Sequence, residues 1–360
     1  MCWQAILVNY RSAALMVEAV RSLADSSLAG GRIDVVDNST CASEAALLRS
    51  QLPAVCQLHV AERNLGFAAA CNLAFAQADS EFVLLLNPDA RLQPGALALL
   101  VDFLRTNPRA AAVGPRVFWD EGRQFLMPLS TFPSPGWYVR HCLGGLVPGW
   151  QRLARRRFRQ EAIGAWQARE PFAVAALSGG HVLLRRQAVL AAGGLFDPAF
   201  FMYWEDSDLM RRLRATGGTL HVQPKAEAVH LYSHSPAKDA LIGTGWTVYR
   251  DKYFAAWPWR WLAHGHGRGP WGRALPVLRD APWTPTGVTL PVPAQWPSWL
   301  LELGPVADFV PAIGHLGTGR NCTIPASLLR HFAGCTVYFR LTAADGGLRD
   351  AQHFRVQVAA

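Results

Sequence analysis

The stretch "EFVLLLNPDARL", residues 81–92, indicates the fold more clearly than any other part of the chain. Five apolar residues run without interruption into Asn87, Pro88 and Asp89. A short apolar run that is bounded by turn residues is typical of a strand buried on both faces. Pro88 has no N–H group for a sheet and favours an extended Asn87, so we expect the strand to end there and to present Asp89.

Strand and helix patterns alternate on both sides of this stretch. Strands are predicted over residues 3–10, 33–38, 58–62 and 81–87. Helices are predicted directly after the first strand, over residues 43–52 and 66–78, and from Pro94 onward. Alternating units of this kind, with apolar strands, predict a mostly parallel sheet flanked by helices, which is an α/β fold.

Polar residues gather where the four predicted strands end. The clusters are Asn9-Tyr10-Arg11, Asp37-Asn38, "ERNLGFAAACN" (residues 62–72) and Asn87-Pro88-Asp89. Ligands of such sheets bind beyond the carboxyl ends of the strands. Any one cluster is explained by ordinary turn formation. All four at one edge favour a binding site.

Composition sets the class of protein. The chain has 360 residues, 51% of them hydrophobic, which allows one large domain and a smaller one. No apolar run reaches the roughly 18 residues of a membrane span. The N-terminus reads as a strand and not as a signal peptide. Seven scattered Cys without a Cys-x-x-Cys pair indicate reduced thiols in the cytoplasm and argue against zinc.

Residues 137–169 form a basic segment, with seven Arg against one acidic residue, Glu161. Trp, Tyr, Phe and Leu are interleaved with the charges. This pattern suits an anionic membrane surface, and a peripheral contact would use the run Arg155, Arg156, Arg157 and Arg159. A solvated helical insertion explains the segment equally well. Nucleic acid could use the same charges but is not expected as a partner.

The composition changes after residue 254. Residues 255–360 hold eleven of the 24 Pro, and short alternating runs at 287–292, 336–344 and 353–360 read as strands. We predict a main domain over residues 1–254, which includes the basic segment. A Pro- and Trp-rich linker, with residues 257–272 at its centre, would join it to a small β-sandwich-like accessory domain.

Six ordered motifs resemble glycosyltransferase family 2, most closely its rhamnosyltransferase-like branch. They are "ILVNYRS", "VVDNST", "ERNLGFAAACN", "LLLNPDA", "GGLFDPAFFMYWEDSDLMRRL" and "AVHLYSHS", and they span about residues 3 to 236. The resemblance implies a GT-A (Rossmann-like) fold, a nucleotide-diphosphate sugar donor, a divalent metal and inversion at the anomeric carbon.

The resemblance also assigns residues to the donor. Asp37 corresponds to the nucleotide-contacting Asp of the family, and Asn64 and Gly66 fall in the loop near the base. Asn9 and Tyr10 end the first strand at the same edge, so we expect them to join the donor nucleotide site.

The metal site implied by the resemblance contains Asp89 and His230. Asp89 matches the last Asp of the Asp-x-Asp motif, and Asn87 stands where many family members have the first. A neutral amide removes one anionic ligand, so metal binding is expected to depend on the oxygens of the diphosphate. Mn²⁺ accepts mixed carboxylate and imidazole ligands more readily than Mg²⁺.

Inverting transfer needs a base that removes the proton of the acceptor hydroxyl. In the family the Asp of a Glu-Asp pair is this base, which selects Asp206, with Glu205 to orient it or to bind acceptor hydroxyls. Asp208, in the same first helical turn, is expected to be a cap. Gly179, Gly180 and Trp204 are placed near the sugar or the acceptor, although a plain turn also explains the two glycines.

Three functions remain open from the sequence. The first is a metal-dependent glycosyltransferase of bacterial surface polysaccharide synthesis, such as O-antigen synthesis, with a glycan or a polyprenyl-diphosphate-linked acceptor. The second is a nucleotidyltransferase, although the basic phosphate loop of that class is absent near the first strand. The third is a non-catalytic sugar-binding protein with a degenerate site.

Overall fold

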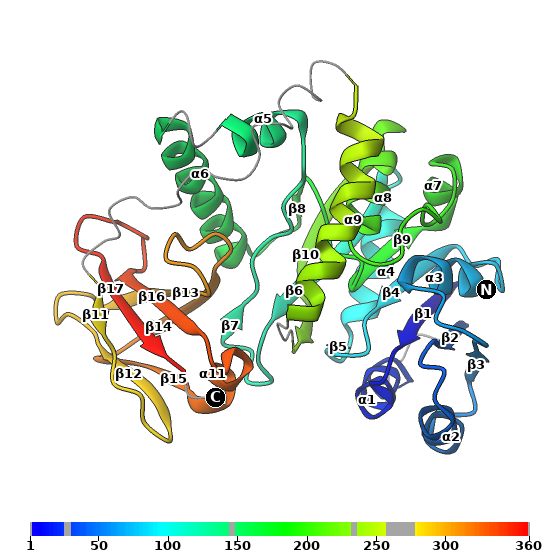
Figure 1. Cartoon of the computed structure of the whole chain (residues 1–360), viewed down its shortest axis with the longest axis horizontal. Coiled ribbons are helices and arrows are strands. Elements are labelled where there is room, and N and C mark those ends of the chain that lie inside the picture. The colour runs from blue at the N-terminus through cyan, green and yellow to red at the C-terminus, as the bar shows by residue number, and fades with distance from the viewer. Residues whose placement is uncertain (1, 25–29, 144–147, 232–235, 257–277, 359–360) are drawn as a thin grey trace.

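The predicted strand before Asp89 is present as β4 (Phe82–Leu86), within a large β-sheet that has helices on its faces (Figure 1). The structure, a computed structural model, describes residues 2–24, 30–143, 148–231, 236–256 and 278–358. All five residues of β4 are at most 2% exposed. The prediction of a strand buried on both faces is therefore confirmed.

Strands and helices alternate along the first part of the chain, as predicted. The elements are β1 (Trp3–Asn9), α1 (Ala13–Ala24), β2 (Gly31–Asp37), α2 (Ala42–Gln51), β3 (Cys56–Val60), α3 (Phe67–Phe75), β5 (Ala90–Leu92) and α4 (Ala96–Thr106). β3, β2, β1 and β4 are neighbours in this order and pair in parallel. Their carboxyl ends therefore share one edge of the sheet.

The next part of the chain widens this sheet. Its elements are β6 (Ala110–Phe118), β7 (Phe125–Leu126), α5 (Pro135–Leu143), α6 (Pro148–Gln167), β8 (Phe172–Ala173), β9 (His181–Arg185), α7 (Arg186–Ala191), α8 (Glu205–Ala215), β10 (Thr219–His230) and α9 (Pro236–Phe254). β9 lies antiparallel between β4 and β6, and β10 pairs in parallel with β6. The expected α/β fold with a mostly parallel sheet is confirmed.

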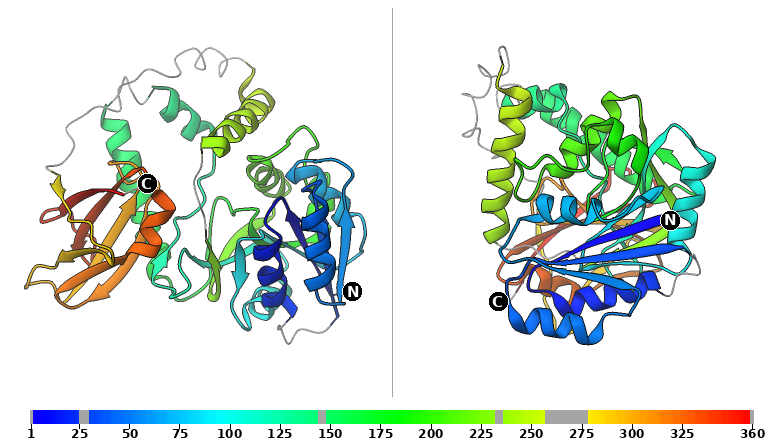
Figure 2. Two further views of the ribbon diagram at one scale, coloured as in Figure 1. Left: turned by 60° about the horizontal axis from the view of Figure 1, so that its bottom comes forward. Right: turned by 90° about the vertical axis from the view of Figure 1, so that its right-hand side faces the viewer.

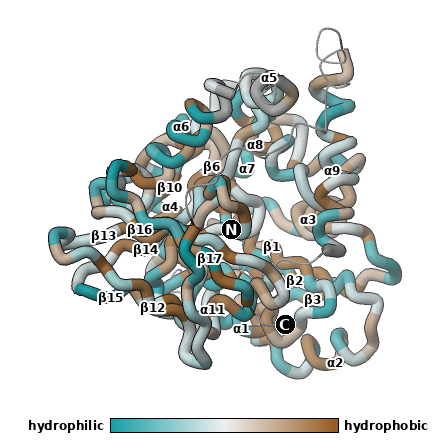
Figure 3. The backbone as a smooth tube through the Cα atoms, turned by 60° about the vertical axis from the view of Figure 1, so that its left-hand side comes forward, coloured by the Kyte–Doolittle hydropathy of each residue, from teal (hydrophilic) through white to brown (hydrophobic). Residues whose placement is uncertain are grey.

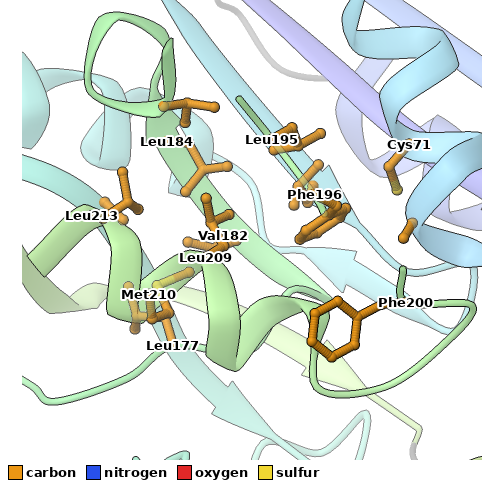
Figure 4. Packing of buried hydrophobic residues seen from close by; sticks show 14 of the residues in the cluster. Cys71, Leu177, Val182, Leu184, Leu195, Phe196, Phe200, Leu209, Met210 and Leu213 are labelled. Atoms are coloured by element: carbon orange, nitrogen blue, oxygen red, sulfur yellow. The ribbon is translucent and has the colours of Figure 1, made fainter. Parts of the chain in front are cut away.

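Two apolar cores form on the two faces of the sheet. Ala5 and Leu7 of β1 pack with α1 and α4, whereas Ile6 and Val8 pack with α3 and α8. Figure 2 shows the helices on the two sides of the sheet, and Figure 3 shows hydrophobic residues concentrated along β1 and β2. In Figure 4, Leu209 of α8 lies against Val182 of β9. The start of α8 is thereby held above the middle of the sheet.

The C-terminal strands continue the same sheet. They are β11 (Arg279–Asp280), β12 (Gly287–Pro291), β13 (Ser298–Gly304), β14 (Ile313–Thr318), β15 (Asn321–Pro325), β16 (Thr336–Ala343) and β17 (Gln352–Gln357), with α11 (Ala326–Leu329) and a 3₁₀ turn (Arg330–Phe332) before β16. β14 pairs with β7, while β12 and β15 form a second sheet. Both sheets share one core, as in a sandwich.

Helix α6 packs against the C-terminal strands and lies above them in the view of Figure 1. Its Trp166 packs so closely on β14 that a Cβ on Gly314 would lie 2.4 Å from the indole ring. Its Arg159 pairs with the buried Glu302 of β13. The predicted linker at residues 257–272 lies outside the described residues, and the division into two domains stays a prediction.

Candidate active site

Asp89 and His230 lie side by side at the carboxyl end of β4. The antiparallel pairing of β5 with β10 sets His230 opposite Ala90, the residue after Asp89. The Nε2 atom of His230 is 3.2 Å from Oδ1 of Asp89. Burial is the largest single influence on the pKa of Asp89 and raises it, but the hydrogen bond and the charge of His230, together with a backbone hydrogen bond and the charge of Lys238, lower that pKa overall.

The side chains of Asp89 and His230 could supply two of the ligands of a divalent cation, with the others coming from a bound molecule. A carboxylate at the end of a strand and a neighbouring imidazole are groups that Mn²⁺ accepts. Within the described ranges, no group of three His, Cys, Asp or Glu side chains is arranged to hold a metal ion. A cation at Asp89 and His230 would therefore need oxygens from a bound diphosphate or from water to complete its coordination.

Asn87 joins the end of β4 to residues 178–181, which we call the glycine strip. Its backbone N–H donates to the carbonyl of Gly180 over 2.8 Å. A Cβ added to Gly180 would come within 2.6 Å of the Asn87 side-chain nitrogen. Gly180 thus permits close packing of Asn87 on the strip, a requirement that a plain turn would not have.

Asp206 lies on the same strip, at the start of α8. Its Oδ2 accepts a hydrogen bond from the backbone N–H of Gly179 over 3.1 Å, and its Oδ1 accepts one from Ser207 over 2.6 Å. Burial raises the pKa of Asp206, although these N–H groups act in the opposite direction. A carboxylate with a raised pKa is a stronger base than an ordinary Asp.

Glu205 points into the protein, where it is only 5% exposed. Burial, together with the charge of Asp206, raises the pKa of Glu205 to about 8. Its Oε2 has no hydrogen-bond partner among the described residues. The raised pKa favours the protonated form of Glu205 at neutral pH, and its role in orienting Asp206 or binding acceptor hydroxyls stays a prediction.

The prediction that Asp208 caps α8 is wrong. Its Oδ2 accepts a hydrogen bond from Arg212 over 2.8 Å, and its Oδ1 accepts one from the hydroxyl of Tyr253 over 2.6 Å. Lys252 lies 2.7 Å from the same oxygen. Asp208 is fully buried, and it ties α8 to α9.

Asp37 and Asn9 meet at the ends of β2 and β1. Asn9 is fully buried and donates hydrogen bonds to Asp37 over 3.0 Å and to Glu44 over 3.1 Å. The second oxygen of Asp37, Oδ2, has no hydrogen-bond partner in the described part of the chain. Asn9 is therefore placed to orient Asp37, whose second oxygen is buried without a hydrogen-bond partner among the described residues, and the contact of Asp37 with a nucleotide stays a prediction.

Asn38 organises the loop that contains Asn64 and Gly66. Its side chain donates to Oδ1 of Asn64 over 2.9 Å and to the carbonyl of Gly66 over 3.1 Å. Gly66 has a φ of +80°, and a Cβ there would lie 2.5 Å from the carbonyl of Phe201. The loop thereby contacts the segment that leads into α8. Tyr10, at the end of β1, is 51% exposed.

Trp204 begins α8 in a left-handed conformation, with a φ of 72°. Its indole N–H donates to the carbonyl of Ile242 over 3.0 Å, and its ring lies 4.8 Å from that of Trp246 in α9. A backbone conformation of this kind costs about 1–3 kcal/mol and persists only where the surroundings enforce it. α9 thus fixes the residue that precedes the Glu-Asp pair.

The expected membrane-facing arginines do not share one environment. Arg156 and Arg157 are exposed. Arg155 lies 3.2 Å from Asp308, and Arg159 lies 2.7 Å from Glu302, with its side chain only 10% exposed. The prediction is wrong for Arg159, because the C-terminal strands cover this side of α6.

Several site residues were not selected from the sequence. Asn38 belongs to a polar cluster predicted at the end of the second strand but was given no role, and Glu44 was not singled out. In the structure Asn38 donates a hydrogen bond to Asn64, and Glu44 accepts one from Asn9. His181 follows the two glycines of the strip, and its ring lies 5.5 Å from that of His230. Burial lowers the pKa of His181 to about 3, so this imidazole is neutral.

The Asp89–His230 pair lies beyond the carboxyl ends of the strands of an α/β sheet, where ligands of such sheets bind. Residues 4–247 match the family model "Glycosyltransferase like family 2", and the chain therefore belongs to that family. It is a glycosyltransferase. Neither a nucleotidyltransferase nor a non-catalytic sugar-binding protein is supported by this membership.

Curated relatives lie in the rhamnosyltransferase branch, as the motifs predicted. The N-acetylglucosaminyl-diphospho-decaprenol L-rhamnosyltransferase of Mycobacterium tuberculosis is 32% identical over 228 residues, which cover 56% of this chain and 70% of that protein. The rhamnosyltransferase WbbL of Escherichia coli is 26% identical over 161 residues, which cover 44% of this chain and 55% of that protein.

Two solved structures are also similar. GalNAc-T7 with UDP, GalNAc and Mn²⁺ has a TM-score of 0.46 and 16% identity, and the match covers 71% of this chain and half of that one. The mannosyltransferase PcManGT from Pyrobaculum calidifontis, in complex with GDP-Man and Mn²⁺, has a TM-score of 0.44 and 16% identity, with 74% of this chain and 65% of that chain covered.

Membrane insertion was not expected from the sequence. Within the described ranges, no helix combines the length and the apolar character that crossing a bilayer requires.

Proposed function

We propose that this chain transfers a sugar, with rhamnose as the first candidate, from a nucleotide-diphosphate donor to a lipid-linked glycan. The acceptor would be a sugar on a polyprenyl diphosphate, in the synthesis of a bacterial surface polysaccharide such as O-antigen. The similarity to the mycobacterial N-acetylglucosaminyl-diphospho-decaprenol L-rhamnosyltransferase supports this choice. The reaction would be inverting and dependent on a divalent cation.

One observation carries the proposal: the glycine strip joins the base to the metal pair. Gly179 donates to Asp206, and the next residue, Gly180, packs on Asn87. Asn87 is two residues before Asp89. A sugar held over the strip would therefore have a carboxylate on one side and the diphosphate site on the other.

The proposed chemistry is a single displacement. Asp206 removes the proton of the acceptor hydroxyl, whose oxygen forms a bond to the anomeric carbon. The bond from that carbon to the diphosphate oxygen breaks, and the diphosphate leaves with the electron pair. The proton ends on Asp206, whose raised pKa favours this transfer.

The other residues would hold the donor. Asp37, with its unpaired Oδ2, would contact the nucleotide, and Asn64 and Gly66 would lie near the base. Asp89 and His230 would hold a divalent cation. When bound, the cation would offset the charge that develops on the departing diphosphate.

A screen of nucleotide sugars tests the proposal. Each donor is incubated with Mn²⁺ and a synthetic GlcNAc-diphospho-prenol, and the release of nucleoside diphosphate is measured. We expect one deoxyhexose donor to be consumed only when both the acceptor and the cation are present. The proposal fails if no donor is consumed, or if excess chelator leaves the rate unchanged.

A further inference from the structure

A pocket opens beside the glycine strip, on the side of β9 that faces β6 and β7 and away from β1 and β2. Ser178 and His181 of the strip form one of its walls. Its cavity volume is about 60 Å³. Since roughly 10–15 Å³ of such volume holds one water, the pocket accepts a group of a few heavy atoms and not a whole lipid.

The other walls of the pocket are mostly apolar. Met127 and Leu129 follow β7, Phe172 comes from β8, and Trp166 comes from α6. Two contacts fix the position of Trp166. Its indole N–H donates to the carbonyl of Met127 over 3.0 Å, and its ring packs on Gly314 of β14. The C-terminal strands thus position one wall of a pocket that borders the active site.

Arg116 adds a cation to this apolar pocket. Its guanidinium donates a hydrogen bond to the carbonyl of Ala168. Among the described residues, no carboxylate lies within ion-pair distance of this guanidinium. The nearby Glu227 instead pairs with Arg123, over 2.7 Å. Burial lowers the pKa of Arg116, and the charge of Glu227 offsets this only in part. A half-buried cation without a counter-ion favours the binding of an anion.

We propose that this pocket binds one part of the isoprenoid diphosphate of the acceptor, namely the phosphate that is bonded to the isoprenoid and the first carbons of the chain. Arg116 would pair with a phosphate oxygen, and Trp166, Met127 and Leu129 would pack on the first isoprenoid carbons. An anion joined directly to an apolar chain matches a guanidinium that, in the described part of the chain, has no carboxylate partner and lies among mostly apolar side chains. The inference rests on the proposed function, because it names the part of that acceptor which lies beside the base.

Binding of geranyl diphosphate to the full chain, measured by calorimetry in excess chelator, tests this site. The chelator prevents the probe from binding through a cation at Asp89. We expect saturable binding that is at least tenfold tighter than that of geraniol or of inorganic pyrophosphate. Arg116→Gln should weaken binding at least tenfold, whereas Arg116→Lys should retain most of it.

Two matched variants separate this pocket from other sites. Arg169→Gln removes an exposed charge close by, and Asp89→Ala removes the metal pair, so each should leave the affinity within about twofold of the wild type. Leu129→Gln changes a partly exposed wall residue and should weaken binding several-fold even if Arg116→Gln does not fold. Circular dichroism checks folding.

The proposal is overturned if Arg116→Gln binds geranyl diphosphate as tightly as the wild type. It is also overturned if Asp89→Ala abolishes binding, because the probe then occupies the donor site, or if Arg169→Gln weakens binding as much as Arg116→Gln. Should the donor screen fail while geranyl diphosphate binds through Arg116, the proposed transfer is wrong and the isoprenoid diphosphate site remains.

Discussion

Asp206 accepts a hydrogen bond from the backbone N–H of Gly179, and this 3.1 Å contact fixes the carboxylate against the strip that packs on Asn87. Backbone N–H groups of Gly179 and Ser207 hold the two oxygens of Asp206, and the side chain is half-buried. Precise placement of a catalytic group contributes strongly to rate. The contact supports the proposal that Asp206 is the base, a role that the resemblance to the family first suggested.

Asp206→Asn is the first test of that assignment. The change is nearly isosteric, so donor affinity should stay within a few fold, while kcat should fall by roughly 10² to 10⁴, the usual contribution of a general base. Asp208→Asn is the matched control. Because Asp208 ties α8 to α9, its loss should lower the Tm more than the Asp206 change does. A silent Asp206→Asn combined with a large loss of kcat in a folded Asp208→Asn would refute the assignment.

Asp89→Ala tests the metal pair. The variant should lose transfer, and its donor affinity should fall to the level that the wild type shows in excess chelator, because His230 alone is a poor site for a divalent cation. Donor binding is measured by calorimetry with and without Mn²⁺. If Mn²⁺ still tightens donor binding in the variant, Asp89 is not a ligand.

The residues of the candidate site differ in how far the sequence could predict their positions and partners. Asp89 follows from a local pattern, an apolar run that ends in Asn-Pro-Asp. His230 joins it through the pairing of β5 with β10, which no local pattern indicates, so only the resemblance to the family suggested it. Asp208 was misread as a cap because its partners Lys252 and Tyr253 come from α9.

Long-range contacts also explain why the sequence did not predict the ion pair of Arg159 in α6. The Arg run looked like a single charged surface, but Arg159 pairs with Glu302, which is 143 residues away in the chain. Arg116 carried no signal, since an isolated Arg in a strand looks like any other surface charge. Strands and helices follow local periodicity, whereas the partners of a charge depend on tertiary packing.

Glu205→Gln should change how stability depends on pH. The pKa of Glu205 is about 8 in the folded chain and near 4.5 when unfolded, so the folded state holds a proton that the unfolded state loses. The stability that Glu205 contributes is therefore complete below pH 4.5 and is lost as the pH rises through about 8.

An amide cannot ionise, so the Tm of Glu205→Gln relative to the wild type should rise between pH 5 and pH 8.5. The exposed Glu62→Gln is the control and should show no such trend. A Tm difference that stays constant over this range would show that Glu205 is already ionised in the folded protein.

Arg152, Arg156 and Arg157 are the exposed arginines of α6, and they replace the original set as candidates for a membrane contact. At about 1 kcal/mol for each charge near an anionic surface, replacing all three with Gln should weaken binding to anionic vesicles roughly 100-fold. Co-sedimentation at low and high salt measures this. Arg159→Gln should instead lower the Tm, because Arg159 pairs with the buried Glu302. Equal binding by the wild type and the triple variant would make α6 a solvated insertion.

The configuration of the product tests the central claim most directly. A single displacement with Asp206 as the base allows no covalent glycosyl-enzyme intermediate, so the new linkage must have the anomeric configuration opposite to that of the donor. Proton NMR of the first product formed by the wild type, with the donor found in the screen, reports this configuration. We predict complete inversion; a product that retains the donor configuration would contradict the mechanism.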